Sequence, residues 1–226
     1  VYGIYLEKGA MNRGIARKET FIPISTATPE RLLIASDYRK EELEEIIALR
    51  RGELKPTASF AKFFWQSEHF VFQRPGFFTS VRMFSIRNQN MEHSHNSEGI
   101  LNHHRGDGTN YLSIIGDEYL NIWPVYDWQK IPGTTILQKP ELPGESELQK
   151  SGVTAFVGAV TDGEYGAVAF DFISPHDLTR ARKGWFFFDD VYVCLGAGIE
   201  TPTRTQPVVT TINQALLKGE VIVSDL

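Results

Sequence analysis

The chain has 226 residues, of which 42% are hydrophobic and 23% charged, and its 28 acidic and 23 basic side chains leave a net charge of −5. This apolar fraction argues against disorder and is sufficient for one large core or two modest ones. Apolar runs stay below the roughly 20 residues of a membrane helix, and Lys and Arg are scattered rather than gathered in a basic stripe. The composition therefore predicts a globular protein that binds neither a membrane nor nucleic acid.

The two ends of the sequence indicate a piece of a longer chain. It starts at Val1 without an initiator methionine or a signal-type apolar segment, and residues 220–226 have the pattern of a strand with nothing after it. The single cysteine, Cys194, excludes an intrachain disulfide and lies in an apolar run typical of a strand. We therefore expect further sequence on both sides of these residues.

Residues 1–55 differ in pattern from the rest of the chain. Thr28 followed by Pro29 is a helix start signal, a capping residue and then proline at the first helical position. Half of the residues from 30 to 53 are charged, and apolar residues recur at helical spacing until Gly52. This pattern predicts one amphipathic helix with a solvated charged face, and the stretch around Pro56 is then a linker.

From about residue 59 onward, short apolar and aromatic runs alternate with turn residues. Residues 153–160 and 165–173 flank the turn that contains Asp162 and Gly163, and residues 185–188 and 191–195 flank a second short turn. Strands so close in sequence pair antiparallel. The pattern therefore predicts a mainly β protein with a large antiparallel β-sandwich.

A dense polar stretch covers residues 87–108 and contains four of the six histidines. Because alternate residues of a strand share a face, His93 and His95 could bind a metal ion together with His103 and His104. An exposed polar loop is the simpler interpretation of the same residues. Residues 106–108 have the composition of a turn, since no strand-to-helix context for a phosphate cradle surrounds them.

Two further groups of side chains could contact a sugar polymer. Arg13 and Arg17 lie four residues apart, so in a helix they share a face and could bind a carboxylate or sulfate, although most such pairs are simply solvated. The rings of Trp123, Tyr126 and Trp128 could stack on sugar rings or belong to the core. The residues alone leave these alternatives open.

Four sequence blocks together resemble the central domain of polysaccharide lyase family 8, which contains chondroitin AC, hyaluronate and xanthan lyases, with chondroitin AC lyases the most similar. They are residues 106–110, 118–135, 185–189 and 195–199. The resemblance implies that residues 1–55 are the last helices of an α/α toroid and that residues 56–226 begin a large antiparallel β-sandwich domain. It also implies β-elimination, in which a base removes the C5 proton of a uronic acid and the glycosidic oxygen leaves from C4.

The resemblance assigns roles to four residues. Asn96 matches the family's asparagine, whose amide neutralises the uronate carboxylate and stabilises the intermediate. Arg13 and Arg17 match the family's arginine pair, which binds substrate anions, and Glu92 matches a supporting glutamate, one residue further from the asparagine than in the family pattern. We therefore expect Asn96, Arg13, Arg17 and Glu92 to be catalytic, with Asn96 and the arginines also binding substrate.

The family's catalytic His and Tyr precede the arginine pair by more residues than this chain supplies. We therefore expect the base to lie outside these 226 residues and the chain alone to be inactive. The resemblance implies no cofactor and no catalytic metal, and it leaves room for a structural cation such as calcium. It further implies a monomer that is secreted or periplasmic and acts on an acidic polysaccharide. A non-catalytic carbohydrate-binding β-sandwich module is the alternative function.

Overall fold

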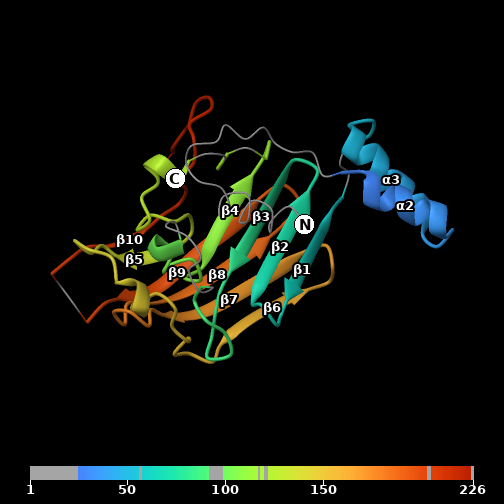
Figure 1. Cartoon of the computed structure of the whole chain (residues 1–226). Helices are drawn as coiled ribbons and strands as arrows, with labels where there is room; N and C mark the ends of the chain where they lie inside the picture. Colours follow the sequence, from blue (N-terminus) through green and yellow to red (C-terminus); the bar gives the residue numbers. More distant parts are fainter. Residues whose placement is uncertain are drawn as a thin grey trace. The chain divides into compact units, whose positions relative to one another are not determined.

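The computed structural model describes residues 25–55, 58–91, 99–116, 118–119, 122–202 and 205–224 (Figure 1). The chain divides into a helical unit that ends at Ala58 and a β unit that continues from Ser59. None of the helices in the described ranges is long and apolar enough to cross a bilayer.

The helical unit contains two helices, α2 (Ala27–Ala35) and α3 (Lys40–Arg51), so the prediction of one helix from residue 30 to 53 was wrong. The chain leaves the helix at Ser36, whose backbone is extended and whose hydroxyl accepts a hydrogen bond from the Tyr38 amide at 3.1 Å. Such local side-chain bonds compete with helical hydrogen bonding. The end of α3 agrees with the prediction, because Gly52 caps it at φ 74°.

The first sheet of the β unit has four antiparallel strands in the order β1-β2-β3-β4. Short turns join the first three strands, whereas β3 and β4 are joined by the long β3–β4 connection, residues 83–108, which contains the 3-10 helix η1 (Gly99–Leu101). The strands are β1 (Phe60–Phe64), β2 (His69–Arg74), β3 (Phe77–Arg82) and β4 (Thr109–Ser113).

The second sheet has the order β6-β7-β8-β9 and is also antiparallel. The β6–β7 and β8–β9 hairpins confirm the two predicted ones, and Cys194 lies within the last strand. A small sheet pairs β5 with β10, and the 3-10 helices η2 and η3 lie in the connections. These elements are β5 (Thr135–Leu137), β6 (Val157–Thr161), β7 (Gly166–Ile173), β8 (Arg180–Phe187), β9 (Tyr192–Glu200), β10 (Val208–Thr210), η2 (Trp123–Val125) and η3 (Glu145–Glu147).

The main core lies between the two four-stranded sheets and is mostly aromatic. Phe70 of the first sheet stacks on Phe187 of the second with ring centroids 4.9 Å apart, and Trp185 is 2% exposed. Burial of rings of this size is a large part of the free energy that holds two sheets together. The arrangement confirms the predicted mainly β, antiparallel architecture.

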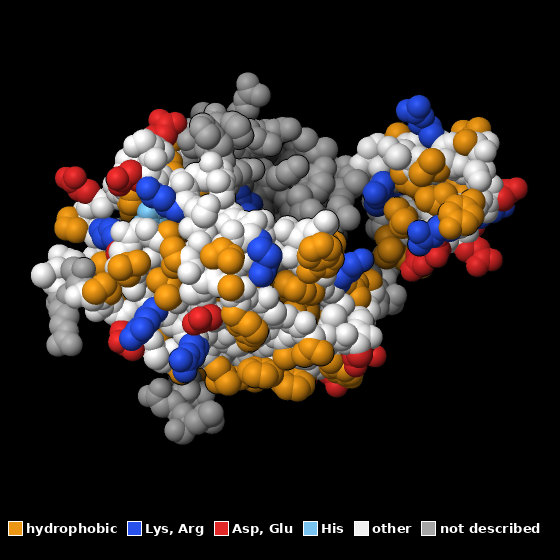
Figure 2. Space-filling model, turned by 90° about the horizontal axis from the view of Figure 1, so that it is seen from below, with side chains coloured by type: hydrophobic (Ala, Val, Ile, Leu, Met, Phe, Trp, Pro, Cys, Tyr) orange, Lys and Arg blue, Asp and Glu red, His pale blue; other side chains and the backbone are white. Residues whose placement is uncertain are grey.

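The outer face of the second sheet carries apolar side chains among charged ones, as Figure 2 shows from below. The strand register places Val160, Ala167, Phe186 and Val193 in one row across β6 to β9. Val160, Phe186 and Val193 are 69%, 39% and 40% exposed, so this row presents apolar side chains to solvent.

A second core cluster contains part of the aromatic segment, residues 123–128, together with neighbouring residues. Tyr126 is buried in it, and Trp128 packs against Tyr126 edge to face with centroids 5.2 Å apart. These two rings therefore belong to the core rather than to a sugar-stacking surface, while the side chain of Trp123 lies outside the described part of the chain.

The predicted strand at residues 220–226 is wrong for the residues described there. Residues 220–224 have no regular structure, and Val221, Ile222 and Val223 are 71%, 81% and 85% exposed. An apolar run becomes a strand only where a neighbouring strand satisfies its backbone groups, and none of the described strands pairs with it.

Candidate functional site

The β3–β4 connection contains most of the polar residues that the sequence singles out. Glu92 and Asn96 lie in residues 92–98, outside the described residues, together with His93 and His95. Arg13 and Arg17 also lie outside them. The described structure therefore shows the two ends of the segment that carries Asn96, and the site is built from those ends.

Asn90 lies just before residues 92–98 and is fully buried. Its side-chain amide donates to the backbone oxygen of His103 at 2.7 Å and of Leu148 at 2.9 Å, and its side-chain oxygen accepts from the Lys150 amide at 2.8 Å. The same amide lies 3.1 Å from Nε2 of His176, which must therefore be the acceptor. One side chain thus connects four chain segments.

Residues 88–91, which precede residues 92–98, lie along residues 148–152. The backbone amide of Asn90 donates to the Lys150 oxygen at 3.0 Å, and the Gly152 amide donates to the Asn88 oxygen at 3.2 Å. The Gln149 side chain donates to the Met91 oxygen at 3.2 Å, and Met91 itself is buried. The chain is thus held by both backbone and side-chain bonds up to the last described residue before position 92.

Residues 102–108, which follow the segment, are buried, so their interpretation as an exposed loop was wrong. His104 Nδ1 lies 2.6 Å from Oδ2 of Asp107, and both side chains are excluded from solvent. Gly106 packs so closely that a Cβ there would lie 2.6 Å from the Asn90 oxygen. The polar composition reflects internal pairing rather than solvation, and residues 106–108 form a turn, as predicted.

Three histidine rings gather beside Asn90. The ring centroid of His103 is 4.0 Å from that of His104 and 5.1 Å from that of His176. Even so, within the described ranges no group of three His, Cys, Asp or Glu side chains is arranged to bind a metal ion. The metal-site alternative also involves His93 and His95, which lie outside those ranges.

Burial lowers the pKa of His103 to about 2 and that of His176 to about 4, with the neighbouring His104 and Lys139 adding to the effect. Burial likewise raises the pKa of the Asp107 carboxyl, against the opposing influence of His104. The imidazoles of His103 and His176 are therefore neutral at physiological pH, which matches the acceptor role of His176 toward Asn90.

The lowered pKa values of His103 and His176 predict a loss of stability in acid. An unfolded histidine has a pKa near 6.5, so the unfolded chain binds protons that folded His103 excludes, and the free energy of unfolding should fall as pH drops from about 6.5 toward 4. The slope should be on the order of 1 kcal/mol per pH unit for this histidine. Urea unfolding across this range would measure it. His103→Gln should have a flatter profile, and identical profiles would contradict the assignment.

Lys183 of β8 reaches the same connection from the second sheet. Its ammonium donates to the Asp107 backbone oxygen at 3.3 Å and to the Gly133 backbone oxygen, and it lies 5.4 Å from the Trp185 ring centroid. Burial lowers the pKa of Lys183 to about 8. No sequence pattern indicates this residue, because a lone lysine in a strand carries no local sign of burial.

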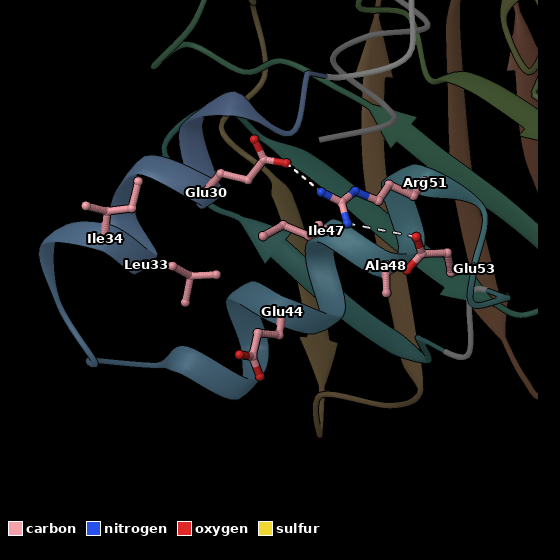
Figure 3. Close-up of a pocket in the computed structure, with 8 residues that line it drawn as sticks. All are labelled: Glu30, Leu33, Ile34, Glu44, Ile47, Ala48, Arg51 and Glu53. Atoms are coloured by element: carbon pink, nitrogen blue, oxygen red, sulfur yellow. Dashed lines mark hydrogen bonds and ion pairs between the residues drawn. The ribbon is translucent and has the colours of Figure 1, made fainter.

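The helical unit has a pocket of its own, about 450 Å³ in volume (Figure 3). Arg51 lies in its wall and pairs with Glu30 at 2.9 Å and with Glu53 at 3.9 Å. These charges therefore neutralise one another at an open, solvated rim, which is a weak arrangement for catalysis. We accordingly place the candidate site at the β3–β4 connection.

Comparison with known proteins identifies the family. The model of the polysaccharide lyase family 8 super-sandwich domain matches residues 59–226. The chain belongs to polysaccharide lyase family 8. A chondroitinase AC from Pedobacter heparinus is 35% identical over 98% of this chain and 32% of its own length.

Solved structures of family 8 lyases agree with this assignment. A chondroitinase AC lyase, studied as enzyme–oligosaccharide complexes, has a TM-score of 0.75 and 34% identity over 86% of this chain and 29% of its own. The Streptomyces coelicolor A3 chondroitin AC lyase, solved in complex with chondroitin sulphate, has a TM-score of 0.62 and 33% identity over 77% of this chain and 24% of its own. The chain thus spans about a third or less of these lyases.

Proposed function

We propose that the chain is part of a lyase that cleaves chondroitin sulfate or hyaluronan by β-elimination. The observation that carries this proposal is the 35% identity to a chondroitinase AC over 98% of the chain. Similarity confined to a shared scaffold would support the fold alone, because one fold serves many functions. Here the matched stretch covers 98% of the chain, so it extends beyond the strands of the scaffold and spans the predicted Asn96.

The chemistry explains why an uncharged amide is suited to the site. A proton next to an ionised carboxylate is barely acidic, because its removal places a second negative charge beside the first. A donor that neutralises the carboxylate and stabilises the resulting intermediate lowers this barrier. In the proposed mechanism, Asn96 is that donor, Glu92 supports it, and Arg13 and Arg17 bind the anionic substrate.

The proposal places the catalytic base outside residues 1–226 and makes this chain inactive by itself. It assigns the base to none of the six histidines here, and the described His103 and His104 are buried. We further propose a monomer that is secreted or periplasmic and needs no cofactor for catalysis, with a structural calcium ion compatible with this scheme.

An assay of the complete gene product, with whatever sequence flanks residues 1–226, tests this function. Incubation with chondroitin sulfate or hyaluronan should release sugars with a conjugated double bond that absorbs in the ultraviolet. Elimination consumes no water, so the product masks should sum to the mass of the substrate without an added water. Residues 1–226 alone should give no product.

A hydrolase would instead add one water for each bond cleaved, so the summed mass of its products would exceed the mass of the substrate. This difference in mass separates the two classes of reaction. A folded gene product that releases no unsaturated sugar from any uronic acid polymer would refute the lyase function. The alternative, a non-catalytic carbohydrate-binding module, is less well supported because Tyr126 and Trp128 pack in a core cluster.

A further inference from the structure

Strand β9 forms one edge of the second sheet and lacks the features that usually protect an edge. The strand order places β8 on one side of it, and within the described ranges no strand lies on the other. Native edge strands are commonly short or carry Lys or Pro, because their unpaired backbone groups can bind another strand. β9 has nine residues without Lys, Arg or Pro, and Glu200 is its one acidic residue. Such a sequence is typical of a strand that is buried on both faces.

The hydrogen bonds with β8 determine which backbone groups of β9 face the open edge. The Phe188 amide donates to the Val191 oxygen at 2.9 Å, so these two residues form a hydrogen-bonded pair. Hydrogen-bonded and non-hydrogen-bonded pairs alternate along antiparallel strands, and the register is unbroken over residues 192–197. The backbone N–H and C=O groups of Tyr192, Cys194 and Gly196 therefore point away from β8, aligned for a further strand.

Apolar side chains on both faces of β9 are exposed at this edge. On the outer face, Val193 and Leu195 are 40% and 57% exposed. On the inner face, Cys194 Sγ lies 3.6 Å from Oδ1 of Asn110 on β4, yet Cys194 is exposed. Side chains on the inner face of a sandwich normally interdigitate within the core. The open edge thus leaves part of the inner surface of the sandwich uncovered.

The three other edges of the two large sheets have neighbours. The amide of Ala61 in β1 donates at 2.8 Å to the oxygen of Gly163, which lies in the turn after β6, so the β1 and β6 edges meet. On β4, the Asn110 amide donates to the Pro132 oxygen at 2.8 Å. Among the described residues, β9 is therefore the edge without such a backbone contact.

We propose that β9 pairs, in the complete gene product, with a further strand from the sequence beyond residue 226, which extends the second sheet. The chain covers 32% of the chondroitinase AC that it matches, so most of such a relative lies outside the matched region. The described elements before β1 are helices, so the sequence that follows residue 226 is the better source of strands. Such pairing does not depend on lyase activity, and its test needs no substrate.

The native thiol of Cys194 reports on this pairing in the complete gene product. An alkylating reagent should label it at least about 100-fold more slowly than a cysteine introduced by Asp190→Cys, in the exposed turn of the same hairpin. Peptide masses at successive labelling times give both rates, and comparable rates would overturn the proposal. Burial raises the pKa of the Cys194 thiol, which by itself slows alkylation at neutral pH, so slow labelling is combined with a second measurement.

Hydrogen exchange along β9 is that second measurement. Amides that bond to β8 set the protected rate for this strand, since they are paired whether or not the edge is open. The outward amides of Tyr192, Cys194 and Gly196 should exchange within about tenfold of that rate, which fragmentation in the mass spectrometer resolves residue by residue. Exchange of these three amides near the rate of an unstructured chain would overturn the pairing, whatever the reactivity of the thiol.

A photo-cross-linker identifies the strand that lies beside β9. With p-benzoylphenylalanine in place of Leu195, the reactive group reaches a neighbouring strand, since opposed Cβ atoms lie about 5 Å apart. A cross-linked peptide from beyond residue 226 of the same molecule is the expected result. Cross-links confined to residues 1–226, to a second copy or to sequence before Val1 would each overturn the proposed source of the strand.

Discussion

Replacing Asn96 by alanine should lower kcat on chondroitin sulfate by about 100-fold or more, with little change in KM. The amide is proposed to stabilise charge that develops during the reaction, so its loss should raise the barrier by about 3 kcal/mol, as for one oxyanion donor. The complete gene product carrying this substitution is assayed by the ultraviolet absorbance of the unsaturated sugar that it releases, which measures this effect directly.

The adjacent variant Ser97→Ala is the control, since it alters the same segment without removing the amide. Asn96→Asp should be at least as damaging as Asn96→Ala, because it replaces a donor with a negative charge beside the substrate carboxylate. Near-normal turnover in Asn96→Ala would show that another residue performs this role and that the match of Asn96 to the family's asparagine is misplaced.

Gly133→Ala should destabilise the fold by about 3 kcal/mol or more. Gly133 has φ of 82°, a conformation that costs an L-residue roughly 1–2 kcal/mol, and an added Cβ would lie 2.5 Å from Asn110 Cβ and 2.6 Å from the Gly108 oxygen. Overpacking of this kind adds about 1–3 kcal/mol. The same residue accepts the Lys183 bond, so movement here would also disturb a buried charge.

Chemical unfolding of Gly133→Ala and of the control Gly76→Ala measures the difference. Gly76 does not have positive φ, and a Cβ there would meet no atom within 4 Å. The control should therefore be neutral or slightly stabilising, because alanine reduces the freedom of the unfolded chain. Equal stability of the two variants would show that the backbone near Gly133 can move to accommodate a methyl group.

The sheet hairpins could be predicted because their signals are local. Asp162 and Gly163 mark the turn between β6 and β7, and Gly163 has φ of 99°, which few other residues adopt. Apolar runs on both sides then fix which strands pair. The prediction failed where pairing depends on distant residues, as at residues 220–224, whose composition suits a strand but which have no described partner strand.

The candidate site could be predicted only in part, for a related reason. The resemblance indicated Asn96, but no local pattern distinguishes Asn90, which bonds to residues as far away as Lys150 and His176, from its polar neighbours. The sequence around His103 and His104 suggested an exposed loop, because composition shows that residues are polar but not whether they pair with one another inside the fold. Burial of polar groups depends on partners that tertiary structure brings together.

The ammonium of Lys183 offers a chemical means of observing motion in the sandwich. An amine-reactive reagent cannot reach a nitrogen enclosed by the carbonyl groups of Asp107 and Gly133 until β8 separates from those turns. The labelling rate of this one lysine therefore reports how often that contact opens. Mass measurements of the peptide around residue 183 at successive labelling times would follow such openings in the native protein, without any substitution.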